Sequence, residues 1–210
     1  MKYTDMLEST FNSIDYPVFT FRDAELALKK KGITSRYLRL MLHKYSASGR
    51  IKRITKGIYT FHDDAIVVGF AFQPFYYGLE SALSLLGISL QASNNVVMTT
   101  RNVRAGIRSF QGRNYNIIRI KSRLLFGFST IKIGSFWAPV SDLEKTIIDM
   151  LYLNVQIREE LYPEMAKRLD RRKFDRYLER FDKHFSESAK KKIMQIKQHG
   201  WQSNRKVIRC

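Results

Sequence analysis

The stretch FRDAELALKKKGITSRYLRLMLHKYSASGRIKRITKGIYTF, residues 21–61, decides how the N-terminal part of this chain folds. It contains a helix-forming segment, a turn at a glycine, a second helix-forming segment and a tight hairpin with a basic tip. This order is typical of a winged helix-turn-helix. In such a module the second helix usually enters the DNA major groove, and the hairpin, or wing, rests on the backbone.

Sequence signals mark both ends of the first helix. Thr20 and Asp23 have the spacing of a capping box, with Asp in place of the usual Glu. Three lysines, residues 29–31, occupy the last turn, where cations interact favourably with the helix dipole. Gly32 then ends the helix, because glycine accepts the left-handed conformation that a C-terminal cap requires.

The second helix is predicted from Ser35 to about Ala47, with Thr34 or Ser35 as its N-cap. An apolar face at i, i+3, i+4 and i+7 holds Leu38, Met41, Leu42 and Tyr45. The opposite face holds Arg36, Arg39, Leu40 and His43. This outer face is either an ordinary solvated surface or a surface that reads bases. Arginine can bond guanine in bidentate fashion, and a leucine can touch a thymine methyl group.

The hairpin that follows favours the base-reading interpretation. Thr55-Lys56-Gly57 is a turn sequence between two β-rich segments, so Arg53 and Lys56 are expected near the wing tip, where they suit phosphate contacts. We expect Arg36, Arg39 and His43 to approach bases, and Ser35, Lys44, Arg53 and Lys56 to contact phosphates. The predicted DNA-binding residues are Ser35, Arg36, Tyr37, Arg39, Leu40, His43, Lys44, Arg53, Thr55 and Lys56.

A series of motifs in fixed order resembles one protein family. The motifs are GITSRYL (32–38), GRIKRITKGIY (49–59), PFYYGLESALSLLGI (74–88), VVMTT (96–100) and VSDLEKTIIDML (140–151). Over about residues 19–153 the chain resembles AbiEi-type antitoxins, also described as transcriptional regulators of viral defence systems. The resemblance implies a winged-helix repressor of its own operon that counteracts a nucleotidyltransferase-like toxin, as in type IV toxin–antitoxin systems. A stand-alone DNA-binding regulator without a toxin is the alternative.

Composition agrees with a polyanionic partner. The 210 residues are 44% hydrophobic, enough for a packed core, and carry a formal net charge of +18. Double-stranded DNA is the predicted partner; duplex RNA, an acidic protein and an anionic membrane surface are the alternatives. A membrane role is disfavoured because the longest apolar run, residues 65–72, is far shorter than the ~20 residues that span a bilayer. Residues 1–5 lack the features of a secretory signal, so we predict a cytoplasmic protein.

The fold class predicted is α+β: a winged helix-turn-helix (residues 1–62), a mixed α/β domain (63–155) and basic C-terminal helices packed on that domain (156–210). Strands are expected at 96–100, 115–120 and 129–133, a helix at 80–86, and a strand or helical turn at 65–72. Four arginines, Arg101, Arg104, Arg108 and Arg113, are expected in a connection between strands.

The C-terminal segment predicts two amphipathic helices. A break is expected near residues 184–186, with Ser186 as a cap, and Gly200 is expected to end the second helix. The lysine-rich surface of these helices could face DNA, an acidic toxin surface or solvent alone, and the sequence does not choose among them.

An enzyme interpretation rests on Gly134-Ser135 followed by Asp142 and Glu144, which together resemble the Mg²⁺ and phosphate site of a nucleotidyltransferase. A simpler interpretation is a helix start, with Ser141 and Glu144 as a capping box. His62-Asp63-Asp64 is expected in a solvated linker, and Trp137 and Trp201 are expected to pack. The only cysteine is Cys210. We therefore predict no enzyme activity, no metal and no cofactor.

Overall fold

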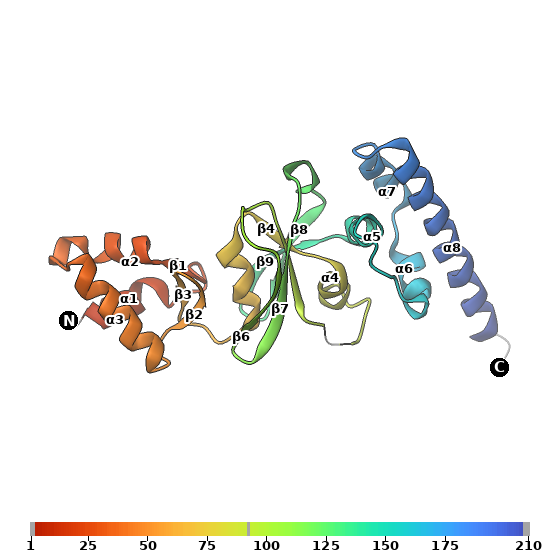
Figure 1. The fold of residues 1–210 in the computed structure, drawn as a ribbon. Coiled ribbons are helices and arrows are strands. Elements are labelled where there is room, and N and C mark those ends of the chain that lie inside the picture. The colour runs from red at the N-terminus through yellow and green to blue at the C-terminus, as the bar shows by residue number, and fades with distance from the viewer. Residues whose placement is uncertain (1–2, 92, 208–210) are drawn as a thin grey trace.

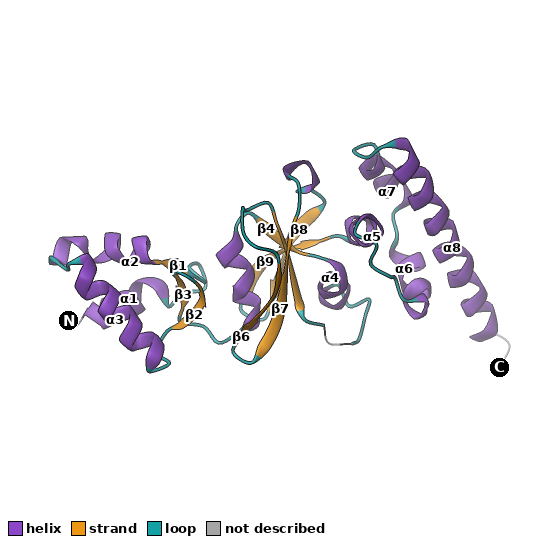
Figure 2. Cartoon of the chain, viewed as in Figure 1, coloured by secondary structure: helices purple, strands orange, loops and turns teal. Residues whose placement is uncertain are grey.

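The computed structural model describes residues 3–91 and 93–207, with side chains described through residue 198. It has the predicted α+β class. Helices and a small sheet form the N-terminal module, a six-stranded sheet lies in the middle, and helices form the C-terminal part (Figures 1 and 2). The molecule is elongated, with the N-terminal module at one end and the last helix at the other (Figure 1).

The N-terminal module has the predicted helix-turn-helix and wing. Its elements are α1 (Tyr3–Phe11), β1 (Phe19–Thr20), α2 (Phe21–Leu28), the 3₁₀ helix η1 (Lys29–Lys31), α3 (Ser35–Ala47), β2 (Lys52–Thr55) and β3 (Ile58–Thr60). The strands form an antiparallel sheet in the order β1-β3-β2. The sequence interpretation missed α1 and β1. Strand β1 has two residues and is recognisable only by its pairing with β3.

The helix ends follow the sequence signals closely. Thr20 and Asp23 form both halves of the capping box, and Gly32 has the left-handed φ of 71°. Thr34, rather than Ser35, caps α3 by accepting a hydrogen bond from the Tyr37 N–H. The apolar face of α3 packs against α1 and α2, with Tyr45 only half-buried; Leu38, Met41 and Leu42 are buried there.

The central sheet has the strand order β6-β7-β5-β4-β9-β8. Its strands are β4 (Phe75–Tyr77), β5 (Asn95–Thr99), β6 (Gly106–Phe110), β7 (Arg113–Arg119), β8 (Phe128–Ile133) and β9 (Phe136–Ser141). The other elements around it are the 3₁₀ helices η2 (Ala65–Phe72) and η3 (Ser122–Leu124), and the helices α4 (Leu79–Leu85) and α5 (Leu143–Tyr152). Strands β5 and β7 pair in parallel, as do β4 and β9.

The three predicted strands are confirmed as β5, β7 and β8, but three others were missed. For residues 65–72 the structure has the helical alternative, a 3₁₀ helix, and not the strand. The expected arginine-bearing connection contains strand β6, so Arg108 lies in a strand and Arg113 begins the next one. Trp137 lies on β9 with 58% of its surface exposed, so the expectation that it packs was wrong. The side chain of Trp201 lies outside the described residues.

The C-terminal part has more helices than predicted. Its elements are η4 (Glu159–Leu161), α6 (Tyr162–Arg168), α7 (Arg171–Leu178) and α8 (Lys183–Val207). The break before the last helix comes earlier than expected, at residues 179–182, where Asp182 accepts a hydrogen bond from the Phe185 N–H at 2.9 Å. Ser186 therefore lies inside α8, and Gly200 does not end it.

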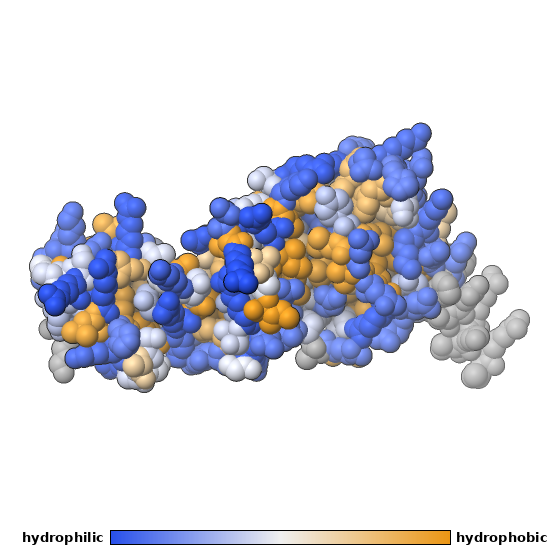
Figure 3. Space-filling view, in the orientation of Figure 1, coloured by the Kyte–Doolittle hydropathy of each residue, from blue (hydrophilic) through white to orange (hydrophobic). Residues whose placement is uncertain are grey.

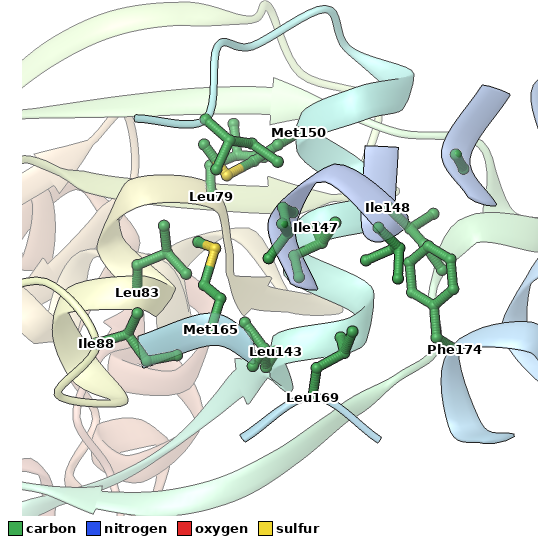
Figure 4. Packing of buried hydrophobic residues seen from close by; sticks show 14 of the residues in the cluster. Leu79, Leu83, Ile88, Leu143, Ile147, Ile148, Met150, Met165, Leu169 and Phe174 are labelled. Carbon is green, nitrogen blue, oxygen red and sulfur yellow. The ribbon is translucent and has the colours of Figure 1, made fainter. Parts of the chain in front are cut away.

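One hydrophobic core joins α4 and α5 to the C-terminal helices (Figure 4). Leu83 of α4, Ile147 of α5, Met165 of α6 and Phe174 of α7 meet there, and all are buried. Ile193 and Ile196 place one face of α8 in the same core. The C-terminal helices thus pack against α4 and α5. The division of the chain at residues 62 and 155 stays a prediction.

A second core joins the wing to the central sheet. Ile54 of β2 and Ile58 of β3 are 6% exposed and pack with Phe72 and Tyr115 in the same cluster. The Tyr115 hydroxyl also donates a hydrogen bond to the Ile54 carbonyl at 3.3 Å. The other face of the wing, with Tyr59, packs toward the helices of the N-terminal module. The wing is therefore held between two cores, and its position relative to the sheet is set by apolar packing.

Candidate nucleic-acid interface

The outer face of α3 is exposed along its length. At about 3.6 residues per turn, Arg36, Leu40 and His43 lie at the centre of this face, opposite the buried side chains. Leu40 is 50% exposed, so an apolar side chain is open to solvent on this face. Among the described residues no carboxylate lies within ion-pair distance of Arg36, Arg39 or Lys44. The centre of the face is thus basic, uncompensated and open.

The residues at the margins of α3 have neighbours inside the module. Tyr37 lies on the α1 side, where its ring packs edge-to-face on Tyr3 at 6.0 Å. The Ser35 hydroxyl donates a hydrogen bond to the Glu25 carboxylate. A phosphate near Ser35 would meet that carboxylate, so the structure disfavours the predicted phosphate contact at this residue.

The other margin of α3 continues into the wing. The Arg39 guanidinium lies 5.3 Å from the centre of the Phe21 ring, and the Phe21 N–H donates to the Gly57 carbonyl in the wing turn at 3.1 Å. Gly57 has a φ of 77°, a conformation that favours glycine at this turn. Arg39 and the wing turn are therefore neighbours on one surface, although 18 positions separate residues 39 and 57 in the sequence.

The wing presents its basic residues to solvent. Arg53 and Lys56 are exposed, and the Arg53 Nε donates to the Thr55 carbonyl at 3.4 Å, which holds the side chain along the turn. Thr55 is half-buried, and its hydroxyl accepts a hydrogen bond from Arg108 Nη1 at 3.3 Å. The sequence interpretation missed Arg108 because it expected a loop there, and only the strand pairing places this arginine beside the wing.

The two carboxylates of the nucleotidyltransferase-like pattern, Asp142 and Glu144, take part in the packing of helices. Asp142 is the N-cap of α5: it accepts from the Lys145 N–H at 2.8 Å and from the Tyr177 hydroxyl at 2.8 Å, and it pairs with Lys173 at 3.0 Å. Burial is the main cause that raises the pKa of Tyr177 to about 12, and its hydrogen bond to Asp142 is the second. Glu144 is buried and accepts from the Asp170 N–H. Both carboxylates are engaged at the junction of α5 with α7.

This geometry corrects the predicted cap by one residue. Ser141 ends β9, and its hydroxyl hydrogen-bonds to that of Thr146, so Asp142 and not Ser141 caps the helix. Gly134-Ser135 lies at the other end of β9, about 20 Å away by strand length. The residues of the nucleotidyltransferase-like pattern are therefore not brought together.

The acidic linker residues also have structural partners. Asp63 pairs with Lys52 at 3.1 Å and accepts from Gln111, and hydrogen bonds from Gln111 and Lys52 lower the pKa of its carboxyl. Asp64 caps η2. Within residues 3–91 and 93–207 no three His, Cys, Asp or Glu side chains are grouped in a way that could hold a metal. No helix in the described part of the chain has the length and apolarity to cross a membrane.

A family model described as transcriptional regulator, AbiEi antitoxin, matches residues 9–62. The N-terminal region is therefore similar to the AbiEi family. The match takes in the end of α1, both helices of the helix-turn-helix and the whole wing. The match stops at the start of the central domain. Beyond residue 62, the resemblance to this family is carried by the sequence motifs alone. This match supports a regulator role.

The fold of the whole chain has a counterpart among solved structures. The structure of the Rv2827c protein from Mycobacterium tuberculosis superposes with a TM-score of 0.65 at 12% sequence identity, covering 94% of this chain and 77% of that one. At this identity the likeness concerns the fold alone. No curated protein matches the chain.

Proposed function

We propose that this AbiEi-type protein is a sequence-specific DNA-binding repressor of its own operon. Arg36, Arg39 and His43 on α3 read or approach bases, while Lys44, Arg53 and Lys56 hold the backbone. Leu40 provides an apolar contact for a thymine methyl group. Tyr37 and Thr55 border this surface.

The observation that supports the proposal is the uncompensated basic surface that runs from α3 through Phe21 to the wing turn. Among the described residues its cations have no carboxylate within ion-pair distance, while most acidic side chains elsewhere are paired or cap helices. Clustered like charges repel one another unless an anion binds, and DNA provides a line of phosphates that can neutralise them. The exposed apolar residue at the centre of the face suits a base edge better than solvent.

The test is fluorescence anisotropy of the full chain on its upstream DNA and on a scrambled duplex over a salt series. We expect Arg36→Ala/Arg39→Ala to abolish most of the preference for upstream DNA, since each bidentate base contact contributes about 1–3 kcal/mol of discrimination. The control, Arg172→Ala/Arg176→Ala, removes the same charge from exposed positions of α7, which lies far from α3 and the wing (Figure 1). Unchanged affinity and preference in a folded Arg36/Arg39 variant would overturn the assignment.

We also propose that residues from about 65 onward neutralise a nucleotidyltransferase-like toxin, as the family resemblance implies. The same Arg36→Ala/Arg39→Ala variant separates the two roles. Co-expressed with the product of a neighbouring nucleotidyltransferase-like gene, it should still rescue growth although it no longer binds DNA. Failure of the wild-type chain to rescue would favour the stand-alone regulator.

A further inference from the structure

Strand β8 is an open edge of the central sheet. In the described part of the chain it pairs with β9 and with no other strand. Every second residue of an edge strand directs its backbone N–H and C=O groups away from the sheet. Residues 128–130 and 132 are exposed, and Ile131 and Ile133 are half-buried. Such an edge is a template on which another strand can pair.

The usual protections of an edge are weak on β8. Native sheets protect their edges with short strands, prolines, bulges and charges. Strand β8 has six residues, pairs with β9 without a shift in register, and contains no proline and a single charge, Lys132. The opposite edge, β6, has five residues, and the Arg108 side chain that it carries bonds to Thr55 of the wing at 3.3 Å. Of the two edges, β8 is therefore the better site for a further strand.

Exposed aromatic side chains lie beside this edge. Trp137 of β9 is 58% exposed and lies directly opposite Lys132, so the two share one face of the sheet. Phe128 is 39% exposed, lies on the same face and stacks on Tyr76 at 5.3 Å. In the view of Figure 3, hydrophilic side chains cover much of the N-terminal module and of the C-terminal helices, and hydrophobic surface gathers over the middle of the molecule.

We propose that two copies of this chain pair through β8, antiparallel, around a two-fold axis at Thr130. In this register the two Thr130 residues lie opposite each other, and Lys132 lies opposite Phe128 of the second copy. The Lys132 ammonium group is then flanked by that ring and by Trp137, which suits a cation. No like charges lie directly opposite each other. An axis at Ile131 would place Lys132 opposite Thr130, without the second aromatic ring.

This pairing places both winged modules on one side of the joined sheet. The two-fold axis of antiparallel pairing across an edge is perpendicular to the sheet, so each face continues into the same face of the second copy. One face carries the wing, through Ile54 and Ile58, and the other carries α4, α5 and the C-terminal helices (Figure 1). Two modules on one side suit an operator with two half-sites. The match to half-sites rests on the proposed function, whereas the pairing of β8 does not depend on DNA.

The test is sedimentation equilibrium of the full chain without DNA, over a concentration series at physiological ionic strength. Salt at this level screens the repulsion between two chains of net charge +18 beyond about 8 Å. We expect the mass of the wild type to approach twice 24.7 kDa as concentration rises. Thr130→Lys and Thr130→Glu should each stay monomeric, because like charges then lie directly opposite each other. An equimolar mixture of the two variants should form the dimer again.

The matched controls make the same two changes on the opposite edge. Ser109 is exposed on β6, so Ser109→Lys and Ser109→Glu should dimerise like the wild type. Circular dichroism verifies that all four variants are folded.

The register has a test of its own in a Cys210→Ser background. Residues opposite each other in an antiparallel pair have Cα atoms about 4.5–5.5 Å apart, within the range of a disulfide. We expect Thr130→Cys to form a covalent dimer on oxidation. Lys132→Cys should not, because the two 132 positions are then four residues apart along the strands, about 13 Å.

Two outcomes would overturn the inference. A wild type that stays at 24.7 kDa at every concentration would leave the β8 edge to a strand of another protein. A dimer that persists in both Thr130 variants would place the interface elsewhere. Either result leaves the proposed function standing, since that function is tested by the preference for upstream DNA. Conversely, a dimer that shows no such preference would keep the pairing and overturn the proposed function.

Discussion

At the residue scale, the second domain contains a buried ion pair between Lys145 and Asp149, and burying two charges costs free energy. Both side chains are buried, the Tyr76 hydroxyl donates to Asp149 at 2.7 Å, and the ammonium group lies over the rings of Tyr76 and Phe126. Burial lowers the pKa of Lys145 and raises that of Asp149, while their mutual attraction opposes both shifts. The pair is stable only because each charge has the other as its partner.

We expect Asp149→Leu to destabilise the fold by about 3–5 kcal/mol, because it leaves the Lys145 charge buried without a partner. The double variant Lys145→Met/Asp149→Leu should lose much less, since both charges are then absent. Urea unfolding monitored by circular dichroism measures both. Lys145→Met completes the cycle, and a double variant that loses as much as the sum of the two single variants would show that the two charges are not coupled.

At the element scale, the start of α5 is where three elements are joined. Asp142 follows β9, caps α5 and receives Tyr177 and Lys173 from α7. One carboxylate thereby links the end of β9, the start of α5 and α7. This explains why a sequence pattern typical of a metal site is compatible with a purely structural role.

We expect Asp142→Ala to lower the free energy of unfolding by about 1–3 kcal/mol, through loss of the cap and of the hydrogen bond from Tyr177. Asp142→Asn, which keeps an acceptor for the Lys145 N–H, should lose less. Thermal unfolding with and without magnesium makes the comparison. A melting temperature of the wild type that rises with magnesium, and does so only when Asp142 is present, would favour the metal-site interpretation instead.

At the scale of the whole molecule, the basic surfaces lie far apart. Helix α3 is at one end of the elongated chain, and α8 is at the other (Figure 1). On α8, Lys190 and Lys191 are exposed, while Lys192 stacks over the Tyr162 ring at 5.2 Å. Since exposed charges are screened beyond about 8 Å at physiological salt, these lysines contribute little to DNA held at α3 and the wing.

We therefore expect Lys190→Gln/Lys191→Gln to leave operator affinity within about twofold of the wild type and the salt slope unchanged. The measurement is the same anisotropy series used for α3. A decrease in slope of about 0.9 or more would mean that DNA also contacts the C-terminal helices.

The sequence predicted best what depends on local interactions. The capping box at Thr20, the left-handed Gly32 and the two faces of α3 each follow from residues within a few positions of one another. It failed where pairing is with distant segments: β4 has only three residues, just before the predicted helix, and β9 contains Pro139. Such strands are stabilised by their neighbours in the sheet more than by their own residues.

By itself, then, the sequence determined the winged helix-turn-helix and the basic outer face of α3, because caps, turns and helical periodicity are local. Only the tertiary structure decided that Glu25 engages Ser35, that Asp142 belongs to a helix junction and that Arg108 lies beside the wing. The physical reason is that each of these contacts depends on how separate cores pack. Ile54 and Ile58 illustrate this, since no local pattern shows that the wing is shared between two cores.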